Sequence, residues 1–166
     1  RFRHSHSKVS RSIVVAPNPD TAVGWTGHVI MDEVGRMPEF RDVWEAMEPI
    51  VSSNPQFCVR MATTPPPDDK HYSYELLAPE PDQEFTANAE GNFYTSTGGI
   101  LVHRVDAWDA VLAGVPLYDL ATRAELTPEE HRAAALDKTA WDRNYGCAFI
   151  KGGSAALSLM AIQNAQ

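Results

Sequence analysis

The chain has 166 residues, of which 43% are hydrophobic, and a formal net charge of −8 at pH 7. This length provides one domain with room for a core, and the composition excludes a disordered chain. No apolar run reaches the roughly 20 residues needed to cross a bilayer. The acidic balance argues against a domain that simply coats nucleic acid. Residues 1–19 carry four basic residues and no acid, which leaves −12 on the remainder, and a solvated edge is favoured over a phosphate contact.

The first elements along the chain are two strands and a turn. Residues 9–15 predict a strand, and the Pro- and Asn-rich residues 17–20 predict a turn. The short apolar run at residues 29–31 is typical of a buried parallel strand. It ends abruptly in two neighbouring carboxylates, Asp32 and Glu33.

A helix is expected between this strand and the next one. Pro38 opens it, and Pro49 is expected to end it. Its apolar positions recur at the helical spacing i, i+3, i+4 and i+7, which predicts a core face. These positions are Phe40, Val43, Trp44 and Met47. Residues 57–62 predict the following strand, which the Thr-Thr-Pro-Pro-Pro run at residues 63–67 stops.

The second half of the chain alternates helices with one further strand. Asp68 or Asp69 is expected to cap a short helix with Tyr72, while residues 78–99 read as a loop. Residues 100–105 predict a strand, and Asp106 caps a helix that Gly114 ends.

Thr127 begins another predicted helix as its N-cap, with Pro and Glu at the positions that suit its first turn. That helix is expected to run to Leu136 or on to Trp141. Residues 151–166 read as a linker with an apolar tail. The order of elements predicts an α/β fold with a largely parallel sheet and flanking helices.

The acid pair points to a nucleoside triphosphatase. One carboxylate can hold Mg²⁺ through its water shell, and the next can polarise the water that attacks the γ-phosphate. Because parallel strands end at the same edge of a sheet, the following strand is expected to bring Thr63 and Thr64 to that edge. Their hydroxyls can bond the attacking water or the γ-phosphate. Alternatively, each run is an ordinary strand end followed by a turn.

Four ordered motifs resemble the ATPase domain of tailed-phage terminase large subunits, most closely the Mu-like branch. They occur at residues 18–33, which end in Val-Ile-Met-Asp-Glu, and at residues 60–65, Arg-Met-Ala-Thr-Thr-Pro. The others are Val-His-Arg-Val at residues 102–105 and Trp-Asp-Arg-Asn-Tyr-Gly-Cys-Ala-Phe at residues 141–149. The resemblance spans roughly residues 9–150.

The resemblance implies a partial P-loop NTPase (RecA/ASCE-like) domain. Residues 1–150 would be its C-terminal part, and residues 151–166 a linker toward a missing nuclease domain. By this resemblance Asp32 is the Mg²⁺-associated acid and binds the cofactor together with Glu33. Glu33 also orients water, and Thr63 and Thr64 couple hydrolysis to movement.

The cofactors implied are ATP and Mg²⁺. The implied partners are double-stranded DNA, a portal protein and a small terminase subunit. The full-length protein is expected to form a homo-oligomeric ring in the host cytoplasm, transiently docked on a procapsid and away from membranes.

The chain also departs from this family. It has no Gly-x-x-x-x-Gly-Lys-Ser/Thr loop, which in the family precedes the region represented here. A longer protein is therefore expected, and the 166 residues alone are expected to be inactive and prone to self-association. Val23 stands where many relatives have an arginine, a candidate charge donor to the transferring phosphoryl group.

Other functions remain open. A catalytically dead, prophage-derived interaction module that retains the fold is the first alternative. A nuclease using Asp32, Glu33 and Asp106 is another, although an N-cap explains Asp106 more simply.

Isolated site candidates are weaker. The six histidines lack zinc spacing, since only His4 and His6 lie close in sequence. Cys58 and Cys147 are expected to be buried free thiols, and Cys147 with His103 lacks a third orienting group.

Overall fold

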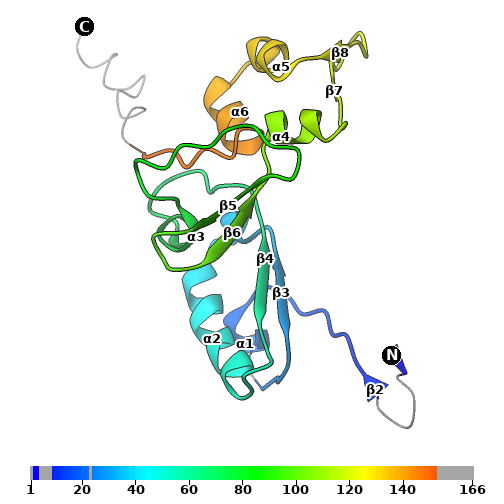
Figure 1. The fold of residues 1–166 in the computed structure, drawn as a ribbon. Coiled ribbons are helices and arrows are strands. Elements are labelled where there is room, and N and C mark those ends of the chain that lie inside the picture. Colours follow the sequence, from blue (N-terminus) through cyan, green and yellow to red (C-terminus); the bar gives the residue numbers. More distant parts are fainter. Residues whose placement is uncertain (1, 4–8, 23, 153–166) are drawn as a thin grey trace, which may run out of the picture. The chain divides into compact units, whose positions relative to one another are not determined.

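The computed structural model describes residues 2–3, 9–22 and 24–152 of a small α/β protein with a short parallel sheet (Figure 1). The chain divides into two compact units. The first contains Arg1–Met31 and Glu39–Arg60, and the second contains Asp32–Pro38 and Met61–Gln166. Within the described ranges, no helix is both long enough and apolar enough to cross a membrane.

The first unit is built around one amphipathic helix. Its elements are β1 (Phe2–Arg3), β2 (Val9–Ser10), α1 (Pro19–Ala22), α2 (Phe40–Ser52) and the first parts of the strands β3 (Val29–Asp32) and β4 (Val59–Ala62). One stripe of α2 is buried, as its apolar spacing predicts, although Trp44 of the expected stripe is only partly buried. The buried residues are Phe40, Val43, Met47 and Ile50.

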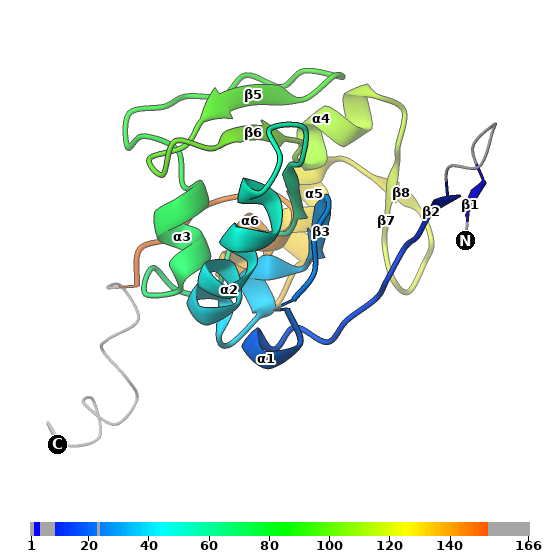
Figure 2. The ribbon, with the colours of Figure 1, turned by 90° about the horizontal axis from the view of Figure 1, so that it is seen from below.

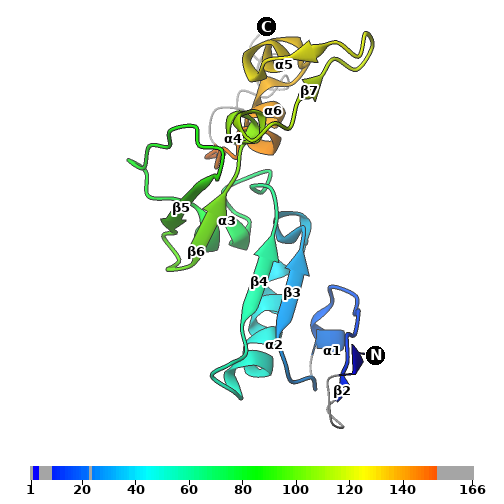
Figure 3. The ribbon, with the colours of Figure 1, turned by 45° about the vertical axis from the view of Figure 1, so that its right-hand side comes forward.

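The strands β3 and β4 form the parallel pair. The Val29 amide donates to the Cys58 carbonyl at 3.0 Å, and the Glu33 amide donates to the Ala62 carbonyl at 2.8 Å. This constant offset is that of a parallel register, and the two arrows run in the same direction in Figure 3. Successive side chains of a strand point to opposite faces, so Met31 is buried whereas Ile30 is 81% exposed.

The second unit carries the remaining elements, among them a hairpin. In it β5 (Asn92–Thr95) and β6 (Leu101–Arg104) run side by side and antiparallel (Figure 2). The others are η1 (Val34–Arg36), α3 (Tyr72–Leu77), α4 (Ala107–Leu112), β7 (Leu117–Tyr118), β8 (Glu125–Leu126), α5 (Pro128–Ala134) and α6 (Lys138–Asn144). The predicted N-caps of α4 and α5 are confirmed, since Asp106 and Thr127 each form a full capping box.

A buried ionic cluster fixes the start of α4. The Arg104 guanidinium lies 2.8 Å from the Asp106 carboxylate and also donates to the Gly146 carbonyl at 2.6 Å. Asp109 is completely buried and accepts the amides of Asn88 and Asp106. Both carboxylates are therefore satisfied inside the protein, and the metal-binding role considered for Asp106 has no support from its surroundings.

Several sequence-based expectations for the strands are wrong. The strand expected over residues 9–15 is limited to β2 at Val9–Ser10, and Val14 is 98% exposed. Residues 78–99 are not all loop, because they contain β5, which the polar character of Asn92 and Thr95 concealed. The α/β class with a parallel strand pair is confirmed, but the described strands form four two-stranded sheets instead of one largely parallel sheet. Among the described strands, β3 and β4 pair in parallel, whereas the other pairings are antiparallel.

The helix boundaries also differ from those expected. Pro49 does not end α2, which continues to Ser52, because a proline removes a single helical hydrogen bond and this one lies near the exposed end. His71, rather than Asp68 or Asp69, caps α3. The helix expected from Thr127 onward breaks after Ala134 and resumes as α6 at Lys138.

The cysteine prediction is half right. Both thiols are free, but Cys58, the residue before β4, is exposed, and Cys147 is partly buried. The linker and apolar tail expected after residue 152, as well as Val23, His4 and His6, lie outside the described residues.

Candidate functional site

The two predicted acids lie at the carboxyl end of β3. Asp32 is the last residue of the strand, and both Asp32 and Glu33 are exposed. Glu33 adopts a left-handed backbone conformation, with φ 54° and ψ 36°, which costs a non-glycine residue on the order of 1 kcal/mol. Its amide donates to the Ala62 carbonyl at 2.8 Å and to the Asp32 carboxylate at 3.0 Å. The end of β4 thus holds Glu33 in its strained conformation.

Thr63 and Thr64 lie at the same end of the parallel pair, directly after Ala62. The Thr63 hydroxyl accepts the Gly35 amide at 2.8 Å and donates to the Thr64 carbonyl at 2.7 Å. Its proton is therefore used inside the protein, and its role here is to fasten the turn that follows Glu33.

Gly35 is required by this close approach. A Cβ atom at this position would lie 2.6 Å from the Thr64 carbonyl oxygen and 2.8 Å from the Thr63 hydroxyl oxygen. The neighbouring Val34 is fully buried and so anchors the turn. The segment 33–37, here called the acid loop, is thus held tightly, although the Glu33 side chain and that of the preceding Asp32 are exposed.

Two further contacts fix the acid loop. His71 Nε2 lies 2.8 Å from the Met37 carbonyl oxygen, and His71 Nδ1 accepts the Ser73 amide at 3.2 Å. Because a carbonyl only accepts, the imidazole carries its proton on Nε2. In addition, the Arg36 guanidinium donates to the Asn144 side chain of α6 at 3.0 Å.

Sequence reasoning missed these partners of the acid loop. The loop and its partners Thr63, His71 and Asn144 are separated by 28, 34 and 108 residues, respectively. No local pattern reports a contact over such a distance. Only the neighbourhood of Thr63 was foreseen, from the expected parallel pairing of the strands.

The sheet end offers one exposed carboxylate, Asp32, of the kind that a hard cation prefers. Mg²⁺ is usually held by one or two carboxylates together with substrate phosphates, and the exposed Asp32 can supply one such ligand. Among the described residues, no group of three or more His, Cys, Asp or Glu side chains could hold a metal on its own. Any divalent cation at Asp32 would therefore need other ligands, such as nucleotide phosphates.

The thiol–imidazole pair considered for Cys147 and His103 has other contacts. The Cys147 thiol donates to the Val105 carbonyl at 3.3 Å, and burial raises the pKa of this thiol. His103 Nε2 lies 2.8 Å from the Glu90 carbonyl oxygen, and its ring stacks on Phe93.

Comparisons with protein-family models, with curated proteins and with solved structures gave no match to this chain.

Proposed function

We propose that the chain is the catalytic-edge part of an ATP-hydrolysing motor domain of the terminase large-subunit type, with a P-loop NTPase fold. One observation carries this proposal. The parallel pairing of β3 and β4 brings Asp32 and Glu33 to the same sheet end as Thr63 and Thr64. Nucleotides bind at this end of parallel sheets, and the resemblance of the four motifs supports the same assignment.

In this proposal Asp32 and Glu33 divide the chemistry. Bound Mg²⁺ neutralises the negative charge that develops on the phosphates. Asp32 would hold this ion through its water shell, whereas Glu33 would accept a hydrogen bond from the attacking water. The strained Glu33 backbone and the bond between Thr63 and Gly35 support a preorganised carboxylate.

The acid loop also offers a path for coupling hydrolysis to movement. Thr63, His71 and Asn144 join it to the end of β4, to α3 and to α6. A change in Glu33 on loss of the γ-phosphate would therefore alter contacts with three elements. By the family resemblance, the movement would drive double-stranded DNA through a portal within a homo-oligomeric ring, together with a small terminase subunit.

The test requires a protein that joins this segment to a phosphate-binding loop. Glu33→Gln keeps the size of the side chain but removes the carboxylate, so ATP binding should persist while turnover falls by about 10²-fold or more. Glu39→Gln is the matched control, because Glu39 is an exposed acid with no capping bond at the start of α2. Unchanged hydrolysis by the Glu33→Gln variant would eliminate the proposal.

A further inference from the structure

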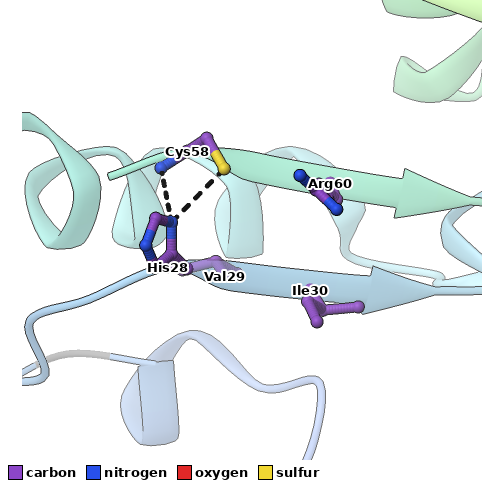
Figure 4. Close-up of a pocket in the computed structure, with 5 residues that line it drawn as sticks. All are labelled: His28, Val29, Ile30, Cys58 and Arg60. Carbon is purple, nitrogen blue, oxygen red and sulfur yellow. Dashed lines mark hydrogen bonds between the residues drawn. The ribbon is translucent and has the colours of Figure 1, made fainter. Parts of the chain in front are cut away.

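The start of the parallel pair carries a shallow hollow that the proposed ATPase does not use. Its volume is about 300 Å³, and it belongs entirely to the first unit (Figure 4). His28, Val29 and Ile30 line it from β3 and the residue before that strand, whereas Cys58 and Arg60 line it from the β4 side. A thiol, an imidazole and a guanidinium therefore share one solvent-facing hollow.

The thiol and the imidazole are in contact across the two strands. His28 Nδ1 lies 3.3 Å from Cys58 Sγ, and it also accepts the Cys58 amide at 3.3 Å (Figure 4). Because Nδ1 accepts this amide, it carries no proton of its own, and its one lone pair can take up the thiol proton when the bond to the amide opens. The edge-to-face contact with the Phe57 ring, with centroids 5.4 Å apart, helps to keep the imidazole in place.

The surroundings of the pair favour an anionic reagent. Arg60 is two residues beyond Cys58 and therefore on the same face of β4, where it is exposed. Its guanidinium can pair with a carboxylate. Ile30, which is 81% exposed, offers an apolar surface in the same hollow. A small molecule with a carboxylate and an apolar portion would therefore suit the guanidinium and the apolar surface beside the thiol.

We propose that Cys58, His28 and Arg60 form a thiol-modification site for low-molecular-weight disulfides that carry carboxylates. The Cys58 thiol gives its proton to His28 Nδ1, and Sγ attacks one sulfur of the reagent. A mixed disulfide forms, the disulfide bond of the reagent breaks, and the departing thiolate takes up the proton from His28. Cys58 is oxidised and the reagent is reduced, so the exchange needs no other reactant.

The second cysteine provides an internal contrast. Cys147 is partly buried, its thiol donates to the Val105 carbonyl, and burial raises its pKa. Because the thiolate is the reacting form, Cys147 should react slowly in the folded chain. A Cys58→Ser variant measures this background directly.

The experiment compares two disulfide probes on the 166-residue chain at pH 7. Dithiobis(nitrobenzoate) carries carboxylates, whereas dithiodipyridine is neutral. In His28→Asn the side-chain amide oxygen takes the position of Nδ1. The hydrogen bond from the Cys58 backbone amide can therefore persist, while the base that accepts the thiol proton is lost. We expect this variant to slow both probes by about fivefold or more, because an ordinary cysteine is only a few per cent thiolate at pH 7.

Arg60→Gln should slow the anionic probe by about threefold and leave the neutral probe unchanged.

The two variants test separate parts of the site. Equal rates for the wild-type and His28→Asn chains, with the circular dichroism spectrum unchanged, would overturn the proposal. If His28→Asn alters the spectrum, the Arg60→Gln variant decides. If this variant slows both probes equally, or slows neither probe, the assigned role of the guanidinium is contradicted. Modification of Cys147 ahead of Cys58, read by mass spectrometry, would also refute the site.

Discussion

Individual residues of the acid loop show why a strained conformation persists. Glu33 has a positive φ of 54°, yet its amide is bonded to the Ala62 carbonyl. Gly35 then passes so close to Thr64 that a side chain would collide with the backbone. A specific contact with the end of β4 thus stabilises the backbone both at Glu33 and at Gly35. The proposed catalytic edge requires such a fixed loop beside the exposed carboxylates of Asp32 and Glu33.

His71 provides a test of this rigidity. His71→Asn retains a good N-cap for α3 but is too short to reach the Met37 carbonyl. Loss of this bond should speed amide hydrogen exchange in residues 35–37 by about fivefold to tenfold. The amides of α3 should be nearly unchanged in the same experiment. His71→Ala, which loses the cap as well, should also speed exchange in α3. Equal exchange of the acid loop in all three proteins would contradict its attachment to His71.

At the level of elements, the hydrophobic spacing of α2 outweighs a proline. The buried stripe continues to Ile50, one residue beyond Pro49, and its packing keeps the last turn helical. The proline nevertheless leaves the Glu45 carbonyl without its usual helical donor, four residues further on. The helix is therefore less stable than its amphipathic pattern would permit.

Pro49→Ala should raise the free energy of unfolding. The restored hydrogen bond and better helix propensity exceed the entropy gained by the unfolded chain, which leaves a net gain of about 1 kcal/mol. Urea denaturation followed by tryptophan fluorescence measures the change. Pro55→Ala is the control, because Pro55 lies outside any helix and its replacement should lower stability slightly. A loss of stability in Pro49→Ala would indicate that the proline is needed in this turn.

The pair of helices α5 and α6 is joined by an ion pair that responds to pH. Arg132 donates to both Asp142 oxygens, at 2.5 and 2.7 Å, and this hydrogen bonding holds the pKa of Asp142 below its ordinary value of 3.8. The folded state therefore favours the carboxylate. Its contribution is present above the pKa of the unfolded chain and is lost as pH falls through the lower folded pKa.

Asp142→Asn should therefore lower thermal stability slightly at pH 7 and have a smaller effect below about pH 4. The effect is small because the Arg132 and Asp142 side chains are 43% and 32% exposed. Melting temperatures of both proteins across this range provide the measurement. A difference that grows toward acid pH would contradict the assigned sign.

For the whole molecule, the sequence predicted local features better than long-range ones. The apolar run of β3, the stripe of α2 and the caps at Asp106 and Thr127 all depend on neighbouring residues, and the structure confirms them. The hairpin of β5 and β6 was not foreseen, because antiparallel pairing depends on residues that the local pattern does not identify. The shared end of β3 and β4 was inferred correctly from strand order, whereas the attachment of the acid loop to α3 and α6 was not.

Metal-directed cleavage of the backbone tests most sharply whether a metal and a nucleotide bind at the shared end of β3 and β4. In a protein that joins the segment to a phosphate-binding loop, Fe²⁺ replaces Mg²⁺ beside ATP, and ascorbate with peroxide then cleaves the backbone near the metal. A nucleotide site at this sheet end predicts ATP-dependent cuts both at residues 32–35 and at residues 63–64, suppressed by excess Mg²⁺ and by Asp32→Asn. Cuts confined to other acidic segments, or cuts that do not depend on ATP, would contradict it.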